Sequence, residues 1–516
     1  MAFGLILLFS GLYTGLKAQQ QDAAVVDTRL GQVSGTLDAN GVHSFKGIPF
    51  ATPPVGELRW KRPQPAASWD GVRACEEFGP SPMQAKPAPF AFWSSEFLIP
   101  EEPISEDCLY LNVWTAAPDP QAARPVLVYI YGGGFRSGGA GCPIYDGAAM
   151  AQKDIVYVSI NYRVGLFGFL AHPELTEEAG GTSGNYAIMD MIAGLEWVRD
   201  NIAGFGGDPN NVTIAGQSAG SFAVNYLTVA PGARGLFHRA IGHSGAGFLP
   251  SQRRPLQTLE QAEAEGLLLA EELGAADLEA LRLVPAERFV GAQHGSQWPL
   301  VDGTVIPESI FDAYAAGHQA QVPLLLGWNS EDILGGRPLG PKEFAQSLEE
   351  RFGDRADAFS KAYPSDNEEV TKNSQNRLGR DQVFGVQAYT WAQMQARQSD
   401  QPVYLYNFTR QVPAYDEATR FGAFHSGEIV YAYDNLHTLD RPWESGDELL
   451  ADLMSGYWAQ FARAGNPNRE GAPNWEPFDP ESPKVMVLDT ASETKTFADA
   501  ELYALWQHYL SDGSYK

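Results

Sequence analysis

The sequence predicts a fold of the α/β class, in which a mostly parallel β-sheet is covered by helices on both faces. Short apolar runs rich in β-branched residues, such as 126–130 and 155–160, have the length and composition of buried strands. They alternate with segments whose apolar residues recur at helical spacing, the clearest of which is 187–202. Buried strands separated by helices form a mostly parallel sheet. Further strands are expected at 212–215, 238–241, 322–326 and 403–408.

Length and composition indicate a large globular protein. With 44% hydrophobic and 19% charged residues, the 516-residue chain can bury an extensive core. This length could hold two or three average domains or one large catalytic unit, and 245–320 and 335–400 are expected to be helix-rich insertions rather than separate domains. The 63 acidic residues outnumber the 36 basic ones, and the formal net charge is −27. Nucleic acids and anionic membranes bind basic surfaces, so neither is expected as a partner.

The first residues have the pattern of a secretion signal. Residues 3–16 form an apolar run that ends before Lys17 and Ala18. This run is too short to span the roughly 30 Å hydrocarbon core of a bilayer, but it suits a signal peptide cleaved near Ala18. We therefore predict a signal peptide at 1–18 and a secreted or periplasmic protein. No cysteine follows the run and no later segment is long and apolar enough to cross a membrane, so no membrane anchor is expected.

Ser218 is the candidate nucleophile. It lies in Gly216-Gln217-Ser218-Ala219-Gly220, a G-x-S-x-G string between the expected strand 212–215 and an apolar-faced helix that starts at Ala219. A sharp strand-turn-helix of this kind presents a serine hydroxyl above the end of a sheet, and the flanking glycines leave room for the turn. The helix N-terminus would stabilise negative charge that develops beside the serine. The alternative is a serine that caps the helix between incidental glycines.

A second glycine cluster indicates a site for an oxyanion. Gly132, Gly133 and Gly134 follow the expected strand 126–130. Glycines allow the backbone to approach a shared cavity closely, so that main-chain N–H groups can point into it. The amides of Gly133, Gly134 and Ala219 would together stabilise an alkoxide. A phosphate-binding loop is unsupported because no Gly-Lys-Ser/Thr follows, and a flexible glycine loop is the remaining alternative.

A base and an acid are expected after the serine in the chain. His425 lies in a loop that follows the late strand 403–408 and is the candidate base. The loop after the strand 322–326 contains two adjacent carboxylates, Glu331 and Asp332, either of which could orient an imidazole. Periodicity cannot choose between the two. Position alone also leaves five other histidines open as the base: His243, His294, His318, His437 and His508.

Several strings in a fixed order resemble the type-B carboxylesterases, the family of the bacterial para-nitrobenzyl esterases and the cholinesterases. The strings are FKGIPFA at 45–51, SEDCLYLNVW at 105–114, NYRVG at 161–165 and GGDP at 206–209, followed by the G-x-S-x-G string. The resemblance covers nearly the whole chain after the leader. It implies a single large α/β-hydrolase domain at 19–516 and the hydrolysis of carboxylic esters.

The resemblance also implies roles for individual residues. The family usually has a catalytic Glu in G-x-N-x-D-E-G, where this chain has Asp332 preceded by Glu331. Because some relatives use Asp at this position, Asp332 is the expected acid and Glu331 the alternative. Ser244 resembles a serine that lies near the family's triad. The other implied residues are Ser218 as nucleophile, His425 as base, and Gly133, Gly134 and Ala219 as oxyanion donors.

Cys75 and Cys108 are the candidate disulfide. Cys108 matches the second cysteine of a disulfide in the family, while Pro82 occupies the usual place of the first. Cys75 lies seven residues before Pro82 and is the remaining candidate to pair with Cys108 in an oxidising compartment. Cys142 is left over, and three free thiols are the alternative.

The sequence therefore predicts a carboxylic ester hydrolase (EC 3.1.1.-) that acts on small-molecule esters through an acyl-enzyme, without a metal or organic cofactor. Two alternatives stay open, a non-catalytic cholinesterase-like binding protein and a hydrolase of amides or thioesters. Phe135, Trp298 and the aromatic loop 90–97 are expected either to line an apolar pocket for acyl or aryl groups or to pack in the core. The sequence does not indicate an oligomeric state.

Overall fold

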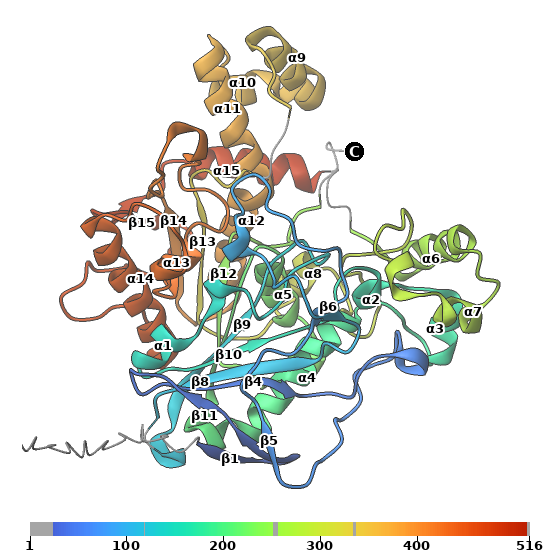
Figure 1. Cartoon of the computed structure of the whole chain (residues 1–516). Helices are drawn as coiled ribbons and strands as arrows, with labels where there is room; N and C mark the ends of the chain where they lie inside the picture. Colours follow the sequence, from blue (N-terminus) through green and yellow to red (C-terminus); the bar gives the residue numbers. More distant parts are fainter. Residues whose placement is uncertain (1–23, 118, 251–255, 334–336, 513–516) are drawn as a thin grey trace, which may run out of the picture.

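The computed structural model describes residues 24–117, 119–250, 256–333 and 337–512. The predicted signal peptide at 1–18 lies outside these residues, and export therefore stays a prediction. One large central sheet runs through the described chain, with two small sheets beside it and helices packed around it (Figure 1). The small sheets are β1 (Val25–Thr28), β2 (Gly31–Ser34) and β5 (Val72–Ala74), and β6 (Ser81–Pro82) with β7 (Ile104–Ser105).

Among the described residues, eleven strands form the central sheet, in the order β16-β15-β14-β13-β12-β11-β9-β10-β8-β4-β3. From β10 through β9 and β11 to β15 all neighbours are parallel, and the strands at the two ends are antiparallel. This confirms the predicted mostly parallel sheet. The strands are β3 (Thr36–Leu37), β4 (His43–Pro49), β8 (Tyr110–Thr115), β9 (Arg124–Ile130), β10 (Val156–Ile160), β11 (Gly207–Gln217), β12 (Arg239–His243), β13 (Leu324–Asn329), β14 (Val403–Phe408), β15 (Lys484–Leu488) and β16 (Glu493–Thr496).

Helices cover the sheet and fill the two predicted insertions. α5 packs on β9, β11 and β12, while α12 packs on β13 and β14. α9, α10 and α11 rise above the rest of the molecule (Figure 1). The helices are α1 (Ala148–Gln152), α2 (Gly165–Phe169), α3 (Pro173–Glu178), α4 (Tyr186–Asn201), α5 (Ala219–Leu227), α6 (Leu259–Leu273), α7 (Leu278–Leu283), α8 (Ile310–Ala315), α9 (Pro341–Phe352), α10 (Ala356–Ala362), α11 (Glu368–Arg380), α12 (Val386–Gln398), α13 (Ile429–Ala432), α14 (Ser445–Ala464) and α15 (Ala500–Ser511).

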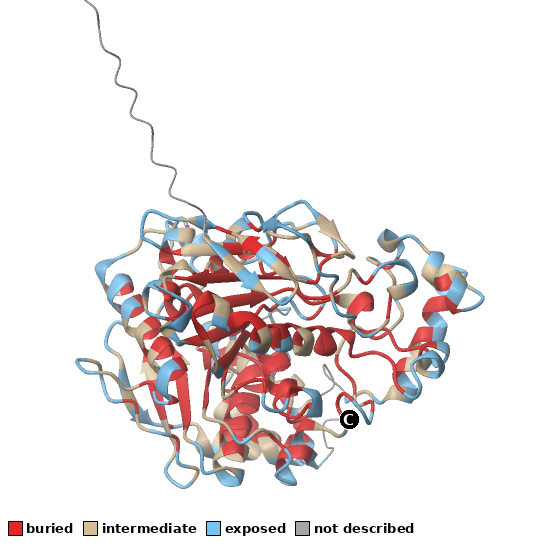
Figure 2. Ribbon diagram, turned by 90° about the horizontal axis from the view of Figure 1, so that it is seen from below, coloured by how far each residue is buried: buried red, intermediate tan, exposed pale blue. Residues whose placement is uncertain are grey.

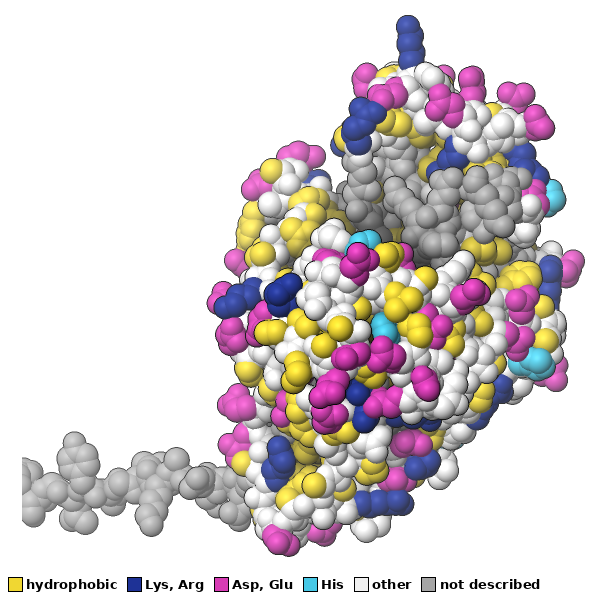
Figure 3. All heavy atoms as spheres, turned by 90° about the vertical axis from the view of Figure 1, so that its right-hand side faces the viewer, with side chains coloured by type: hydrophobic (Ala, Val, Ile, Leu, Met, Phe, Trp, Pro, Cys, Tyr) yellow, Lys and Arg dark blue, Asp and Glu magenta, His cyan; other side chains and the backbone are white. Residues whose placement is uncertain are grey.

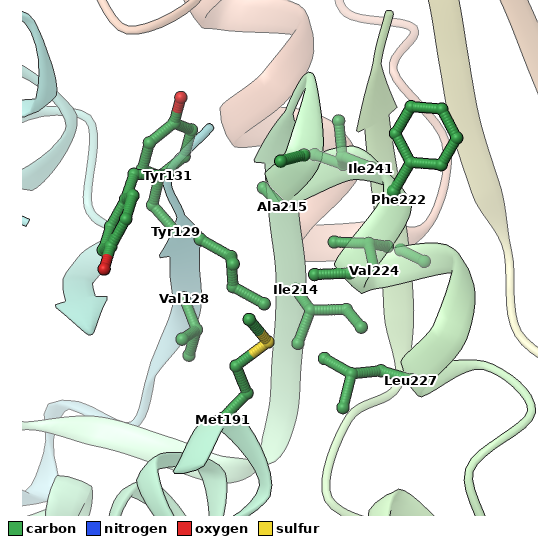
Figure 4. Close-up of a cluster of buried hydrophobic side chains, with 14 of the residues drawn as sticks. Val128, Tyr129, Tyr131, Met191, Ile214, Ala215, Phe222, Val224, Leu227 and Ile241 are labelled. Carbon is green, nitrogen blue, oxygen red and sulfur yellow. The ribbon is translucent and has the colours of Figure 1, made fainter. Parts of the chain in front are cut away.

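The core is densest where the central strands meet α4 and α5. Buried residues lie along the sheet through the middle of the molecule, and exposed ones lie on the outer helices and loops (Figure 2). In Figure 4, Ile214 of β11 lies between Met191 of α4 and Leu227 of α5, and all three side chains are buried. Interiors packed in this way resist deformation. The ends of β9, β11 and β12 are therefore a rigid support for the loops that follow them.

The outer surface carries many acidic side chains. On the face shown in Figure 3, Asp and Glu are spread among fewer Lys and Arg, as the net charge of −27 requires. None of the helices in the described part of the chain combines the length and apolar character needed to cross a membrane.

The three cysteines are free thiols, so the prediction of a Cys75–Cys108 disulfide is wrong. Cys75 follows β5 (Val72–Ala74), where its carbonyl accepts a hydrogen bond from Lys46 N at 2.7 Å. Cys108 lies just before β8 and lines a small cavity with Arg163. The two thiols are therefore held in different packing environments, which their positions in the sequence did not reveal.

Thiol titration is expected to find three free thiols per chain in denaturant and almost no reaction with the native protein at pH 8. Burial raises the pKa of Cys75 to about 11 and that of Cys142 to about 12, and it raises the pKa of Cys108 well above its usual value. The reactive thiolate is therefore scarce at pH 8. A count of one thiol per chain in denaturant would instead show that two of the three cysteines form a disulfide.

Candidate active site

Ser218 occupies a sharp turn between β11 and α5. Its backbone has φ 54° and ψ −123°, a conformation that costs a non-glycine residue about 1–3 kcal/mol. The Ser218 N–H donates to the His243 carbonyl at 2.9 Å, which fixes the turn to β12. Ser218 is partly exposed, whereas Gln217 and Ala219 on either side of it are buried. The turn thus presents one hydroxyl at the end of the sheet.

The two glycines of the string are needed because neighbouring backbone leaves no room for a Cβ. A Cβ on Gly216 would overlap the carbonyl group of Gly220, and one on Gly220 would overlap the Ile130 carbonyl. The Ser218 side chain makes no capping hydrogen bond to α5. These observations favour the nucleophile turn over the helix-cap alternative.

The glycine loop after β9 passes directly against this turn. A Cβ on Gly132 would lie 2.7 Å from the Gln217 carbonyl oxygen and 3.0 Å from Ser218 Cβ. Gly133 and Gly134 have φ 116° and 63°, which glycine adopts readily. Within the described residues, neither amide donates a hydrogen bond, and both glycines are exposed. Their N–H groups are therefore available to a ligand beside Ser218, as is the N–H of Ala219 at the first position of α5.

Asp332 is the carboxylate that contacts the candidate base. His425 Nδ1 lies 2.7 Å from Asp332 Oδ1, and both side chains are buried. The other oxygen, Oδ2, accepts from Ser244 Oγ and from the Asn329 N–H, both at 2.7 Å. These two donors fix the carboxylate, which in turn orients the imidazole so that Nε2 is the nitrogen left for proton transfer.

Glu331, the alternative acid, points elsewhere. Its carboxylate accepts from the Ala423 N–H at 2.8 Å, and burial raises the pKa of this group. Its own N–H donates to the Ala423 carbonyl at 3.1 Å, so Glu331 ties the acid loop to the loop that carries His425. The two adjacent carboxylates therefore have different partners, and only Asp332 contacts the imidazole.

His425 lies between two aromatic rings and the nucleophile turn. Phe384 stacks on the imidazole with ring centroids 4.6 Å apart, and Trp93 meets it edge-on at 6.1 Å. Nε2 lies 3.3 Å from Gln217 Nε2, one residue before the serine. Among the described residues, Ser218 Oγ makes no hydrogen bond. His425 therefore contacts the turn through Gln217, and no hydrogen bond joins its imidazole to the Ser218 hydroxyl. Such bonds often tighten only when substrate is bound.

The five other candidate histidines do not contact the turn with a ring nitrogen. His243 is fully buried, and its Nε2 accepts from Trp458 Nε1 at 2.9 Å. His294 and His318 pair with glutamates on outer segments. His437 and His508 are exposed. His425 is thus the histidine whose ring contacts Asp332 through one nitrogen and Gln217 of the nucleophile turn through the other.

Sequence reasoning missed two polar side chains that organise the site. Asn329 Nδ2 donates to the Phe424 carbonyl at 2.8 Å and to Glu428 Oε2 at 2.5 Å, which joins the acid loop to both sides of His425. Gln217 contacts the imidazole. The Asn of the G-x-N-x-D-E-G pattern was the available signal for Asn329, but nothing in the sequence indicated that Gln217 faces His425.

The aromatic residues predicted to line a pocket differ in how far they are buried. Phe135 is fully buried and packs on Phe169 at 5.2 Å, so it belongs to the core. Trp298 is half-buried and packs on Phe135 at 4.8 Å and on Phe222 at 5.3 Å, one turn into α5. Trp93 from the loop 90–97 is also half-buried and adjoins His425. Trp298 and Trp93 are thus only partly buried, in contrast to Phe135.

Ser244→Ala is expected to lower kcat about tenfold and to cost ~1.5–3 kcal/mol of stability, because a buried carboxylate loses one of its donors. Steady-state kinetics and thermal unfolding measure the two effects. Ser455→Ala is the matched control, since Ser455 Oγ is also buried but donates to the Ala451 carbonyl at 2.6 Å, away from Asp332. Equal kcat values for the two variants would contradict the role of Ser244.

Comparisons with known proteins identify the family of this chain. The model of the carboxylesterase family matches residues 22–506. The chain is 36% identical to the fumonisin B1 esterase of Sphingopyxis macrogoltabida, over 90% of this chain and 86% of that protein. It is 34% identical to the para-nitrobenzyl esterase of Bacillus subtilis, over 90% and 95%. A solved PNB esterase structure superimposes with a TM-score of 0.80 at 31% identity, covering 95% of this chain and 99% of that one.

Proposed function

Since the chain belongs to the carboxylesterase family, whose members hydrolyse carboxylic esters, we propose that Ser218, His425 and Asp332 carry out this reaction in it. The observation that carries the assignment is the buried Asp332–His425 pair, with Nδ1 and Oδ1 2.7 Å apart, whose second imidazole nitrogen lies 3.3 Å from Gln217 Nε2, next to Ser218 in the chain. One fold can support many chemistries, so the function follows from the side chains of this site rather than from the fold.

The proposed reaction has two steps. Ser218 Oγ attacks the ester carbonyl while His425 Nε2 takes the hydroxyl proton. The carbonyl oxygen becomes an alkoxide and accepts hydrogen bonds from the amides of Gly133, Gly134 and Ala219, which are free to donate. Collapse of this intermediate breaks the ester C–O bond, and the imidazolium protonates the leaving alcohol. Water then repeats the sequence on the acyl-enzyme and releases the acid.

Asp332 contributes by holding the imidazole and stabilising its positive charge during each step. It does not need to take up a proton itself. Ser244 and Asn329 donate to its second oxygen, so that the carboxylate keeps its orientation as the charge on His425 changes. We assign Ser244 and Asn329 positioning roles, since neither contacts the reacting atoms.

The proposed substrates are small-molecule esters with apolar acyl or aryl groups. Two half-buried indoles support this, Trp93 beside His425 and Trp298 against Phe222. The matched relatives are named for different esters, fumonisin B1 and para-nitrobenzyl esters, so membership of the family does not select one. An amide or thioester would use the same residues, and a non-catalytic binding role would leave the Asp332–His425 pair without a purpose.

Pre-steady-state kinetics test the proposal. Mixing with p-nitrophenyl acetate is expected to give a burst of about one p-nitrophenol per chain, because acylation releases the alcohol before water regenerates the enzyme. A fluorophosphonate probe should label native protein once, at Ser218, and abolish hydrolysis; heat-denatured protein is the control and should not react. Hydrolysis that persists after complete labelling, or a label on another residue, would contradict the assignment.

A further inference from the structure

His243 lies where the three loops that carry the proposed triad meet. It is the last residue of β12, it is fully buried, and its carbonyl accepts the Ser218 N–H at 2.9 Å. The next residue, Ser244, donates to Asp332 Oδ2 at 2.7 Å. Neither contact involves the imidazole of His243. Because this ring is buried together with both of its nitrogens, each nitrogen requires a polar partner inside the protein.

The contacts of the imidazole fix its tautomer. Nε2 lies 2.9 Å from Trp458 Nε1, and an indole N–H can only donate, so Nε2 is the nitrogen that accepts. The proton of the ring is therefore on Nδ1. Nδ1 faces the Tyr406 hydroxyl at 3.0 Å and Glu428 Oε1 at 3.5 Å. His243 thus presents an N–H group to the carboxylate of Glu428.

Glu428 connects this imidazole to the proposed base and acid. It follows His425 by three residues and is fully buried. Its Oε2 accepts from Asn329 Nδ2 at 2.5 Å, and the Asn329 N–H donates to Asp332 at 2.7 Å. Its Oε1 has no hydrogen-bond partner among the described residues. A buried carboxylate oxygen without a donor is unfavourable, and the Nδ1–H of His243 is the group that offsets this cost.

We infer that His243 is a positioning residue of the proposed reaction. Its Nδ1–H holds Glu428, and through Glu428 it holds the loop of His425 at a fixed place relative to the Ser218 turn. The inference rests on the proposed function and adds one residue to it. The main chain of His243 positions the serine, and its side chain positions the base. Misplacement of reacting groups by about 1 Å lowers the rate of the chemical step about 10²-fold.

His243→Leu and His243→Asn separate this role from packing. Leucine removes both nitrogens. Asparagine places its amide nitrogen near the position of Nδ1, so it can still donate to Glu428, but it fills less of the space beside Trp458. A role in packing alone predicts that leucine is tolerated better than asparagine. The positioning role predicts the opposite order for kcat.

We expect His243→Leu to lower kcat for p-nitrophenyl acetate about 10²-fold and to leave KM within about threefold of wild type. His425 acts in acylation and in deacylation alike, so both steps slow together and KM changes little. His243→Asn should restore kcat to within about tenfold of wild type, because the donor to Glu428 returns. Circular dichroism during thermal unfolding measures the stability of each variant in parallel.

His172→Leu is the matched control. His172 is buried as well, but its Nδ1 accepts from the Glu174 N–H at the start of α3, and it makes no contact with the triad loops within the described part of the chain. This variant should lose stability but keep kcat within about twofold of wild type, as expected for a substitution outside the reacting groups.

Glu428→Gln tests the same contact from the other side. Both neighbours of this carboxylate, His243 Nδ1 and Asn329 Nδ2, donate, and an amide has only one oxygen to accept. The variant should therefore lower kcat by about tenfold or more. Combined with His243→Leu, it should add less than its single effect, because the two substitutions break one contact.

Three outcomes overturn the inference: a kcat of His243→Leu within about threefold of wild type, a His243→Asn variant no more active than His243→Leu, or an equal loss of kcat in His172→Leu. Should His243→Leu not fold, Glu428→Gln decides, and wild-type kcat in that variant would exclude the positioning role. Failure of the proposed function is distinguishable, because the wild type itself would then lack the p-nitrophenyl acetate burst and the fluorophosphonate label.

Discussion

Ser218→Ala is expected to lower kcat for p-nitrophenyl acetate by about 10⁵- to 10⁶-fold, because no other hydroxyl lies at the turn to form the acyl-enzyme. The fold should persist, since alanine keeps the Cβ and the buried neighbours of Ser218 are unchanged. Some residual hydrolysis is expected from the amides of Gly133, Gly134 and Ala219, which still stabilise the oxyanion when water attacks directly.

Steady-state kinetics on enzyme purified free of host esterases measure this effect. Ser221→Ala is the control from the same helix, because Ser221 Oγ is fully buried and donates to the Gly245 carbonyl at 2.5 Å. It should keep kcat within about tenfold of wild type, as expected for a substitution outside the reacting groups. A Ser218→Ala variant that retained wild-type turnover would remove Ser218 from the mechanism.

Asp332→Asn is expected to lower kcat by about 10⁴-fold while the protein remains folded. The amide preserves the shape of the carboxylate but not its charge, so His425 loses the group that orients its ring and stabilises the imidazolium. Glu331→Gln should lower kcat less than about tenfold, because the new amide oxygen can still accept from the Ala423 N–H.

The two variants form a matched pair, since they neutralise adjacent carboxylates in one loop. Parallel measurement of kcat and thermal stability separates a catalytic effect from loss of structure. The opposite order, with Glu331→Gln far more damaging to kcat than Asp332→Asn, would assign the acid to Glu331.

Much of the fold followed from the sequence because buried strands are apolar and short. The strand predicted at 403–408 is β14, with the same bounds. The strand predicted at 212–215 is longer, Gly207–Gln217, because β9 and β12 pair with it on both sides and extend it beyond its apolar residues. Pairing of this kind depends on neighbours that a local pattern does not contain.

The nucleophile turn was predictable because its glycines are sterically required. Neighbouring backbone occupies the place where a Cβ on Gly216 or Gly220 would lie. The glycines of the G-x-S-x-G string are therefore a direct sign of this turn. The acid was not predictable in this way. Glu331 and Asp332 are adjacent and chemically alike, and their different partners, Ala423 and His425, come from a distant segment.

Aromatic residues and cysteines show the same limit. Phe135 and Trp93 are both apolar and lie in loops, yet the first is buried in the core and the second adjoins the imidazole. Cys75 and Cys108 were the candidate disulfide, but the chain packs them against different neighbours. In each case the surroundings of the side chain depend on which distant segments of the chain pack together. Residue type and spacing do not determine this packing.

The most direct measurement is a crystal structure of the enzyme after reaction with a fluorophosphonate. We expect a bond between phosphorus and Ser218 Oγ, with the phosphoryl oxygen about 2.7–3.1 Å from the amide nitrogens of Gly133, Gly134 and Ala219. His425 Nε2 should then lie within hydrogen-bonding distance of the adduct. A phosphonate attached elsewhere, or one whose oxygen faces away from these amides, would contradict the central claim.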